Sequence, residues 1–236
     1  PAVAMTDHGN LFGAVEFYSA AKAKDIRPII GCEVYVAADH RSRTEPRYNH
    51  LVLLCENQEG YRNLIKLVST SYLDGFYYKP RIDKDLLRRH AAGIVALSGC
   101  LKGEVAQKTL RGDAAGAGKA AGEFVEIFGA GNYYLEIQAN GIPEQERANR
   151  GLVELGRRVG IPLVATNDCH YLRQEDAPAH EVLLCISTGK TLQESDRMRL
   201  STDQFYFRSP EEMARLFAEV PEALRATIEI AERCNV

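Results

Sequence analysis

Short apolar runs alternate with longer segments of helical periodicity along most of this chain, and that alternation limits the folds open to it. The short runs predict strands because they are apolar, often β-branched, and end at glycine or polar residues. The longer segments repeat apolar residues at the spacing of a helix face. We expect strands at 2–7, 28–36, 50–55, 94–97, 133–137 and 161–166, and helices at 11–24, 59–73, 113–128 and 143–159.

Repeated strand–helix alternation predicts an α/β architecture with mainly parallel strands. About six strands before residue 170 favour a barrel over a small open sheet, although periodicity leaves closure open. We expect 2–7 to be a buried strand. The last third reads as helical, and Ser209-Pro210-Glu211-Glu212 is a typical helix start.

The composition excludes several classes of protein. With 45% hydrophobic and 26% charged residues, the chain is neither disordered nor a disulfide scaffold. Its net charge of −3 excludes a polycation, so any contact with nucleic acid must be a local patch. No apolar run reaches the ~20 residues that span a bilayer, and no signal segment opens the chain. We therefore expect no membrane partner and a cytoplasmic location.

Six cysteines without a CxxC pair predict free thiols in a reducing compartment, most of them buried. The chain also runs directly from Pro1 into a strand-like segment without a leading loop. We expect it to be a fragment that lacks residues at its front.

Metal-ligand residue types stand at the ends of several predicted strands, where barrel enzymes carry their active sites. Asp168 and His170 are two residues apart, so in an extended backbone they point to one face. A capping aspartate beside an unrelated surface histidine is the simpler alternative for that pair. His8 ends the first strand, where a core histidine satisfied by backbone is the alternative to a ligand. Glu33 lies inside an apolar strand, where a carboxylate needs a partner or a cation unless that strand edge faces water.

Three further features are less specific. Cys100 follows Leu97-Ser98-Gly99, and it is the one cysteine that we expect not to be simply a buried core residue. His50 opens its strand, which is the wrong end for a ligand if all strands are parallel. The other histidines, His40, His90 and His180, are expected at the surface.

An aromatic and basic stretch, Phe76-Tyr77-Tyr78-Lys79-Pro80-Arg81, suits base stacking and phosphate binding. We therefore take Lys79 and Arg81 as candidates for holding a DNA backbone. A packed loop with solvated cations explains this stretch equally well.

The ordered series of motifs carries more weight than any one of them. TDHGNLFGAVEFY, GCEVYV, HLVLL, FYYKPRID, ALSGCLKGEV, YLEIQ and VATNDCHYL, followed by STDQFYF, resembles the PHP (polymerase and histidinol phosphatase) domain of bacterial replicative DNA polymerase III alpha subunits. This resemblance covers roughly residues 2–210. It implies a PHP-type, distorted TIM-like (β/α)7 barrel whose first strand is missing here, with 211–236 as a helical link towards an absent polymerase palm.

The resemblance also implies a site and a reaction. PHP domains carry nine ligand positions around as many as three metal ions, here Zn²⁺ and/or Mn²⁺. Six positions carry over: His8, Glu33, His50, Cys100, Asp168 and His170. The remaining three belong to an upstream His-x-His strand and a following aspartate.

The implied reaction is metal-dependent phosphodiester hydrolysis at a DNA 3′ end, a 3′–5′ exonuclease with Asp168, His170 and His8 as catalytic residues. Nucleotide addition would lie elsewhere in the longer DNA-directed DNA polymerase, and other replicase subunits and the palm in cis are the implied partners. The alternative is a catalytically silent module that stabilises the polymerase and binds a proofreading subunit. A free-standing histidinol-phosphate-type phosphatase is a third alternative, against which FYYKPRID and STDQFYF argue.

Overall fold

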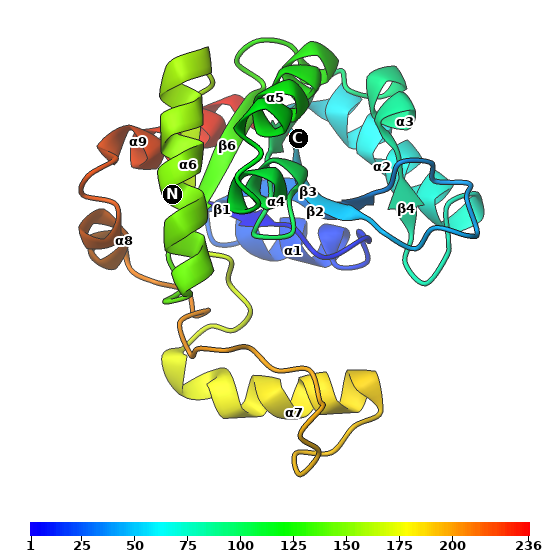
Figure 1. Cartoon of the computed structure of the whole chain (residues 1–236). Helices are drawn as coiled ribbons and strands as arrows, with labels where there is room; N and C mark the ends of the chain where they lie inside the picture. The colour runs from blue at the N-terminus through cyan, green and yellow to red at the C-terminus, as the bar shows by residue number, and fades with distance from the viewer.

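The computed structural model describes residues 1–236 as a curled sheet surrounded by helices (Figure 1). Its strands are β1 (Ala2–Met5), β2 (Arg27–Val36), β3 (Asn49–Cys55), β4 (Arg81–Ile82), β5 (Ile94–Leu97), β6 (Tyr133–Gln138) and β7 (Leu163–Thr166). Its helices are α1 (Ala14–Lys22), α2 (Gln58–Leu73), α3 (Lys84–Arg89), α4 (Glu104–Leu110), α5 (Ala114–Phe128), α6 (Pro143–Val159), α7 (Ala177–Thr188), α8 (Pro210–Leu216) and α9 (Pro221–Arg233). The prediction of an α/β, distorted TIM-like barrel is confirmed.

Strand β3 departs from the parallel arrangement that the sequence predicts. The sheet order is β1-β2-β3-β5-β6-β7, with β4 paired to β2 off this path. Strand β3 is antiparallel to both β2 and β5, whereas the other pairings are parallel. The loop between β2 and β3 contains no helix, so the chain turns back instead of crossing over the sheet.

Alternating side chains give the sheet two different faces. On the outer face the strands pack against the surrounding helices in the larger apolar core. On the inner face a smaller cluster joins the strands to α9: Ile29, Val52, Leu54, Val95, Leu97, Tyr134, Val164, Ala226, Ile230 and Cys234. Helix α9 thus fills one end of the inner face with apolar side chains and leaves the other end to polar ones.

Within residues 211–236, helix α9 packs on the sheet, because its Ala226 and Ile230 are buried in the inner cluster. The start of α8 is as predicted, with Ser209 and Glu212 forming a reciprocal capping box. The division of the chain at residue 210 stays a prediction.

The two edge strands of the sheet, β1 and β7, border an open cleft of about 1060 Å³. All of β1 lines it, together with Val164 and Thr166 of β7 and several residues of α9. The prediction that 2–7 is a buried strand is wrong, since Ala2 and Ala4 are exposed. An edge strand with one paired side explains that exposure.

The segment after β7 forms an arm that carries α7 away from the sheet (Figure 1). Several large apolar side chains of this arm, including Leu172, Leu183 and Ile186, are more than half exposed. No helix of the structure has both the length and the apolar character needed to cross a membrane.

Candidate metal centre

Three predicted ligands, His8, Glu33 and His50, meet at the polar end of the inner face. One ligand atom from each lies within 4.8 Å of the others. The Nδ1 of His8 is 3.1 Å from Glu33 Oε1, and the Nδ1 of His50 contacts the same oxygen. Two imidazoles, one from the segment after β1 and one from β3, thus converge on one buried carboxylate.

The antiparallel course of β3 explains why His50 belongs to this group. Its register pairs His50 with Tyr35, so the start of β3 lies beside the end of β2. Glu33 and Tyr35 are two residues apart on β2 and share its inner face. The objection that His50 stands at the wrong end of its strand therefore does not apply.

The charges of this group stabilise one another. Burial acts to raise the pKa of Glu33, but the close contacts of His50 and His8 with its carboxylate outweigh burial and lower that pKa to about 2. The same contact with Glu33 raises the pKa of His8. The carboxylate is therefore ionised at neutral pH, ready to pair with a cation.

Cys100 reaches the same group from the loop after β5. Its Sγ lies 3.6 Å from His50 Nδ1. Burial, aided by the charge of Glu33, raises the pKa of this thiol above its ordinary value. Without a cation the sulfur therefore remains a neutral thiol.

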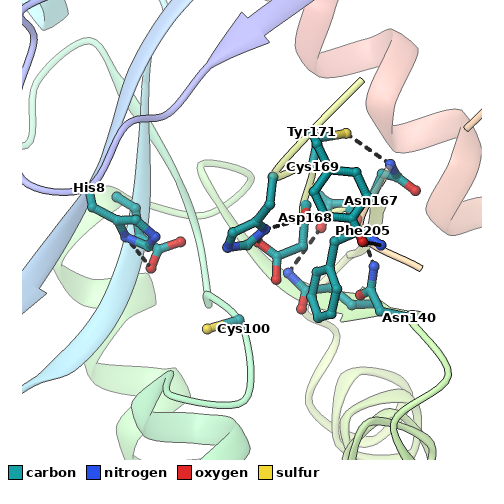
Figure 2. A network of polar contacts seen from close by, with 12 residues as sticks. His8, Cys100, Asn140, Asn167, Asp168, Cys169, Tyr171 and Phe205 are labelled. Atoms are coloured by element: carbon teal, nitrogen blue, oxygen red, sulfur yellow. Dashed lines mark hydrogen bonds and ion pairs between the residues drawn. The ribbon is translucent and has the colours of Figure 1, made fainter. Parts of the chain in front are cut away.

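Asp168 and His170 face the group from the loop after β7. The His170 Nδ1 lies 3.9 Å from Asp168 Oδ1, and the rings of His170 and His8 are 6.4 Å apart. In Figure 2, His8, Cys100 and Asp168 come to one region from separate parts of the chain. Three of the six predicted ligands thus form one group, Cys100 adjoins it beside His50, and Asp168 and His170 face it across the ring of His8.

The prediction that an extended backbone points Asp168 and His170 to one face is wrong. Asp168 has a φ of 50°, which is left-handed and not extended backbone. The pair meets because the chain turns sharply here. Burial, aided by the charge of Glu33, raises the pKa of Asp168.

The donor set fits a metal ion. The buried Glu33 Oε1 has no hydrogen bond of good geometry, although two imidazole nitrogens lie against it. Imidazole, thiolate and carboxylate groups together suit zinc, and the carboxylates and imidazoles also suit manganese. A cation at this point would satisfy the orphaned oxygen.

The two predicted substrate contacts differ in their surroundings. Lys79 is exposed, and its Nζ lies 5.7 Å from the ring centre of Tyr35, which packs against His8 and His50. Arg81 is fully buried. Its guanidinium donates to backbone carbonyls of Gly75, Glu45, His40 and Ser42. These contacts argue against the predicted role of Arg81 in holding DNA, because its donors are already used inside the protein.

Sequence reasoning missed three residues near the site or in the core. His40, expected at the surface, is buried and pairs with Asp83. His180 packs its ring 5.6 Å from that of His170. Glu136 is a buried carboxylate on the inner face of β6. Its place between Leu135 and Ile137 is the same signal that marked Glu33, an acid inside an apolar strand.

Comparison with known proteins agrees with this geometry. The PHP domain family matches residues 1–140. The chain is 46% identical over 240 residues to the DNA polymerase III subunit alpha of Treponema pallidum and 48% identical over 245 residues to that of Thermus aquaticus. Each alignment covers 100% of this chain and 20% of the relative. The Helicobacter pylori subunit is 45% identical over 245 residues, covering 98% of this chain and 20% of its own length.

The chain thus spans about a fifth of the length of these curated relatives. Because the family match covers more than half of the chain, and because ligand types gather at one end of a curled α/β sheet, the chain belongs to the PHP domain family.

Proposed function

We propose that this chain is the PHP domain of a bacterial replicative DNA polymerase III alpha subunit, and that its site is a metal-dependent phosphodiesterase acting on a DNA 3′ end. The observation that carries the proposal is the convergence of His8, Glu33 and His50, with Cys100 and the Asp168–His170 pair facing them. Such a role would place the protein in the bacterial cytoplasm, where it would act with other replicase subunits.

Zn²⁺ or Mn²⁺ would be held by the six ligand side chains. When bound, such ions supply Lewis-acid chemistry, which activates water and offsets the charge of a phosphodiester. Glu33 and Asp168 would contribute negative charge that balances the cations. Cys100 would bind as a thiolate, since its thiol loses its proton to a metal.

A contact between His170 and the backbone indicates which of its two ring nitrogens carries the lone pair. Its Nδ1 lies 2.9 Å from the backbone carbonyl of Asp168, which makes this nitrogen the donor. The lone pair therefore resides on Nε2, which is the atom available to bind a cation or take a proton. Together with Asp168 and the half-exposed His8, it would form the catalytic side of the site.

The cleft between β1 and β7 would admit the substrate, because His8, Glu33, Asp168 and His170 all line it. Lys79, exposed beside Tyr35, is the cation that we assign to the DNA backbone. The same cleft is bordered by both edge strands, which supports the predicted further strand with its His-x-His ligands.

The test is a nuclease assay on a single-stranded 3′ end, with Mn²⁺ or Zn²⁺ and a chain extended to include the predicted upstream strand. We expect shortening of the DNA that stops on chelation, and loss of bound metal in Asp168→Ala and His170→Ala. His90→Ala changes a histidine outside the site and serves as the matched control. Activity that survives chelation would reject the mechanism, and unchanged metal content would remove the pair from the site.

A silent docking module is the second candidate, and the exposed arm favours it. Leu183 and Ile186 of α7 are 61% and 72% exposed, which is unusual for large apolar side chains without a partner. The occupant that we propose is the polymerase part of the same longer polypeptide, since the relatives are about five times the length of this chain.

Amide hydrogen exchange of α7 tests this role. We expect the helix to be protected in the full-length polypeptide and to exchange quickly in the 236-residue chain. Ile186→Asp should destabilise the full-length protein and leave the shorter chain unchanged. Equal exchange in both proteins would argue against the docking role, and nuclease activity would show that the domain is not silent.

A further inference from the structure

Glu136 is a buried carboxylate that the six-ligand site does not use. It lies in the middle of β6 and is 5% exposed. Its side chain is on the inner face, where it lines the same cleft as Glu33 and Asp168. A carboxylate at such a position is costly unless donors satisfy it.

Three donors from different parts of the chain converge on this carboxylate. The backbone N–H of Gly99 donates to Oε2 at 3.0 Å. The hydroxyl of Thr166 and the amide of Gln138 donate to Oε1, at 2.5 Å and 3.0 Å. Both oxygens are therefore occupied, and two of the three donors belong to the segments that carry ligands.

The contact with Gly99 constrains the Cys100 loop. Gly99 immediately precedes Cys100 and has a φ of +82°. A Cβ at this position would lie 2.7 Å from the carbonyl oxygen of His50, so the loop presses directly against the His50 backbone. Glu136 therefore holds a backbone segment that lies between two predicted ligands.

The contact with Thr166 constrains the other side of the site. Thr166 ends β7 and stands two residues before Asp168. The same oxygen that accepts its hydroxyl also accepts the amide of Gln138 from β6. One carboxylate thus joins the loop after β5 to the end of β7.

We propose that Glu136 is the positioning residue of this centre, which fixes Cys100 and Asp168 relative to each other through Gly99 and Thr166. The inference rests on the proposed metal site. A carboxylate suits this task because it accepts at both oxygens. A glutamine would turn an amide towards at least one of the three donors, and so would release one of the two segments.

The test is a titration with Co²⁺, which replaces zinc and absorbs when a thiolate binds it, of the metal-free chain extended to include the predicted upstream strand. Cys100→Ser identifies the absorption that belongs to Cys100. We expect Glu136→Gln to bind Co²⁺ about 10- to 100-fold more weakly, with a weaker thiolate band. Thr166→Val removes only the hydroxyl that reaches Oε1, so it should weaken binding and retain the thiolate band.

Glu123→Gln is the matched control, because Glu123 is an acid paired with Lys84 and Arg88 on the outer helices. It should bind Co²⁺ like the wild type. A folded Glu136→Gln protein with wild-type affinity and band would overturn the inference while the metal site stands. If Glu136→Gln does not fold, wild-type affinity in Thr166→Val would overturn it. A wild-type chain that binds no Co²⁺ would overturn the metal site and this inference together.

Discussion

The imidazole of His50 lies against the carboxylate of Glu33 because β3 runs antiparallel to β2. If β3 were parallel to β2, the start of β3 would lie beside the start of β2, far from the end of β2. One reversed strand therefore brings a predicted ligand to the group on its buried side, since both side chains are more than 90% buried.

This pair leads to a prediction about metal affinity. His50→Gln removes an imidazole that contacts both Glu33 and Cys100, so Zn²⁺ affinity should fall more than the roughly 10- to 100-fold typical of outer-shell changes. Isothermal titration with Zn²⁺ measures the effect. His90→Gln, a change to a histidine outside the site, should leave the affinity unchanged. Equal losses in both variants would point to a general effect on folding.

The buried Glu136 predicts an unusual dependence of stability on pH. Burial raises its pKa from 4.5 to about 7, with the charges of Glu33 and Asp168 adding to the effect. Between these two values the folded protein holds a proton that the unfolded chain has lost. Stability should therefore fall as pH rises through this window, and the full cost is present above it.

The variant Glu136→Gln does not ionise and isolates this contribution. Relative to the variant, the wild type should lose about 3 kcal/mol of unfolding free energy between pH 4.5 and pH 8. Urea unfolding with a chelator present measures it, since a bound cation would change the charge balance. A difference that is constant over this range would contradict the prediction.

Because Arg81 is buried, we expect its substitution to lower the stability of the fold without a direct effect on DNA contact. Arg81→Met removes the guanidinium that donates to the backbone carbonyls of Gly75, Glu45 and Ser42, and the buried hydrogen bonds it loses should cost about 3 kcal/mol. Lys79→Met changes an exposed neighbour and should alter stability by less than about 0.5 kcal/mol. Thermal unfolding compares the two. DNA affinity of the folded proteins should fall with the Lys79 change.

Because α9 packs on the sheet, we expect its residues to contribute to the stability of the folded domain. Ile230 is 3% exposed in the inner cluster, so Ile230→Ala should cost about 2–5 kcal/mol. Ile228 is 62% exposed on the same helix, and Ile228→Ala should cost less than about 0.5 kcal/mol. Denaturant unfolding measures both. Similar small losses would support the prediction that 211–236 is only a link.

Several conclusions followed from local chemistry. Apolar runs and helical spacing are local properties, so they indicated the alternating elements and the α/β class. The capping box at Ser209 is likewise contained in four residues. Glu33 was identifiable because an acid inside an apolar strand requires a partner wherever the strand lies.

Other features required the tertiary structure, because they depend on which segments pair. The direction of β3 brought His50 to the site, and a left-handed turn at Asp168 placed its carboxylate beside His170. The burial of Arg81 depends on carbonyls from a distant loop. By itself, the sequence determined which residue types were available and where strands and helices would form. Strand direction and long-range packing decided which of those residues met, because a contact between distant segments depends on the whole chain and not on local spacing.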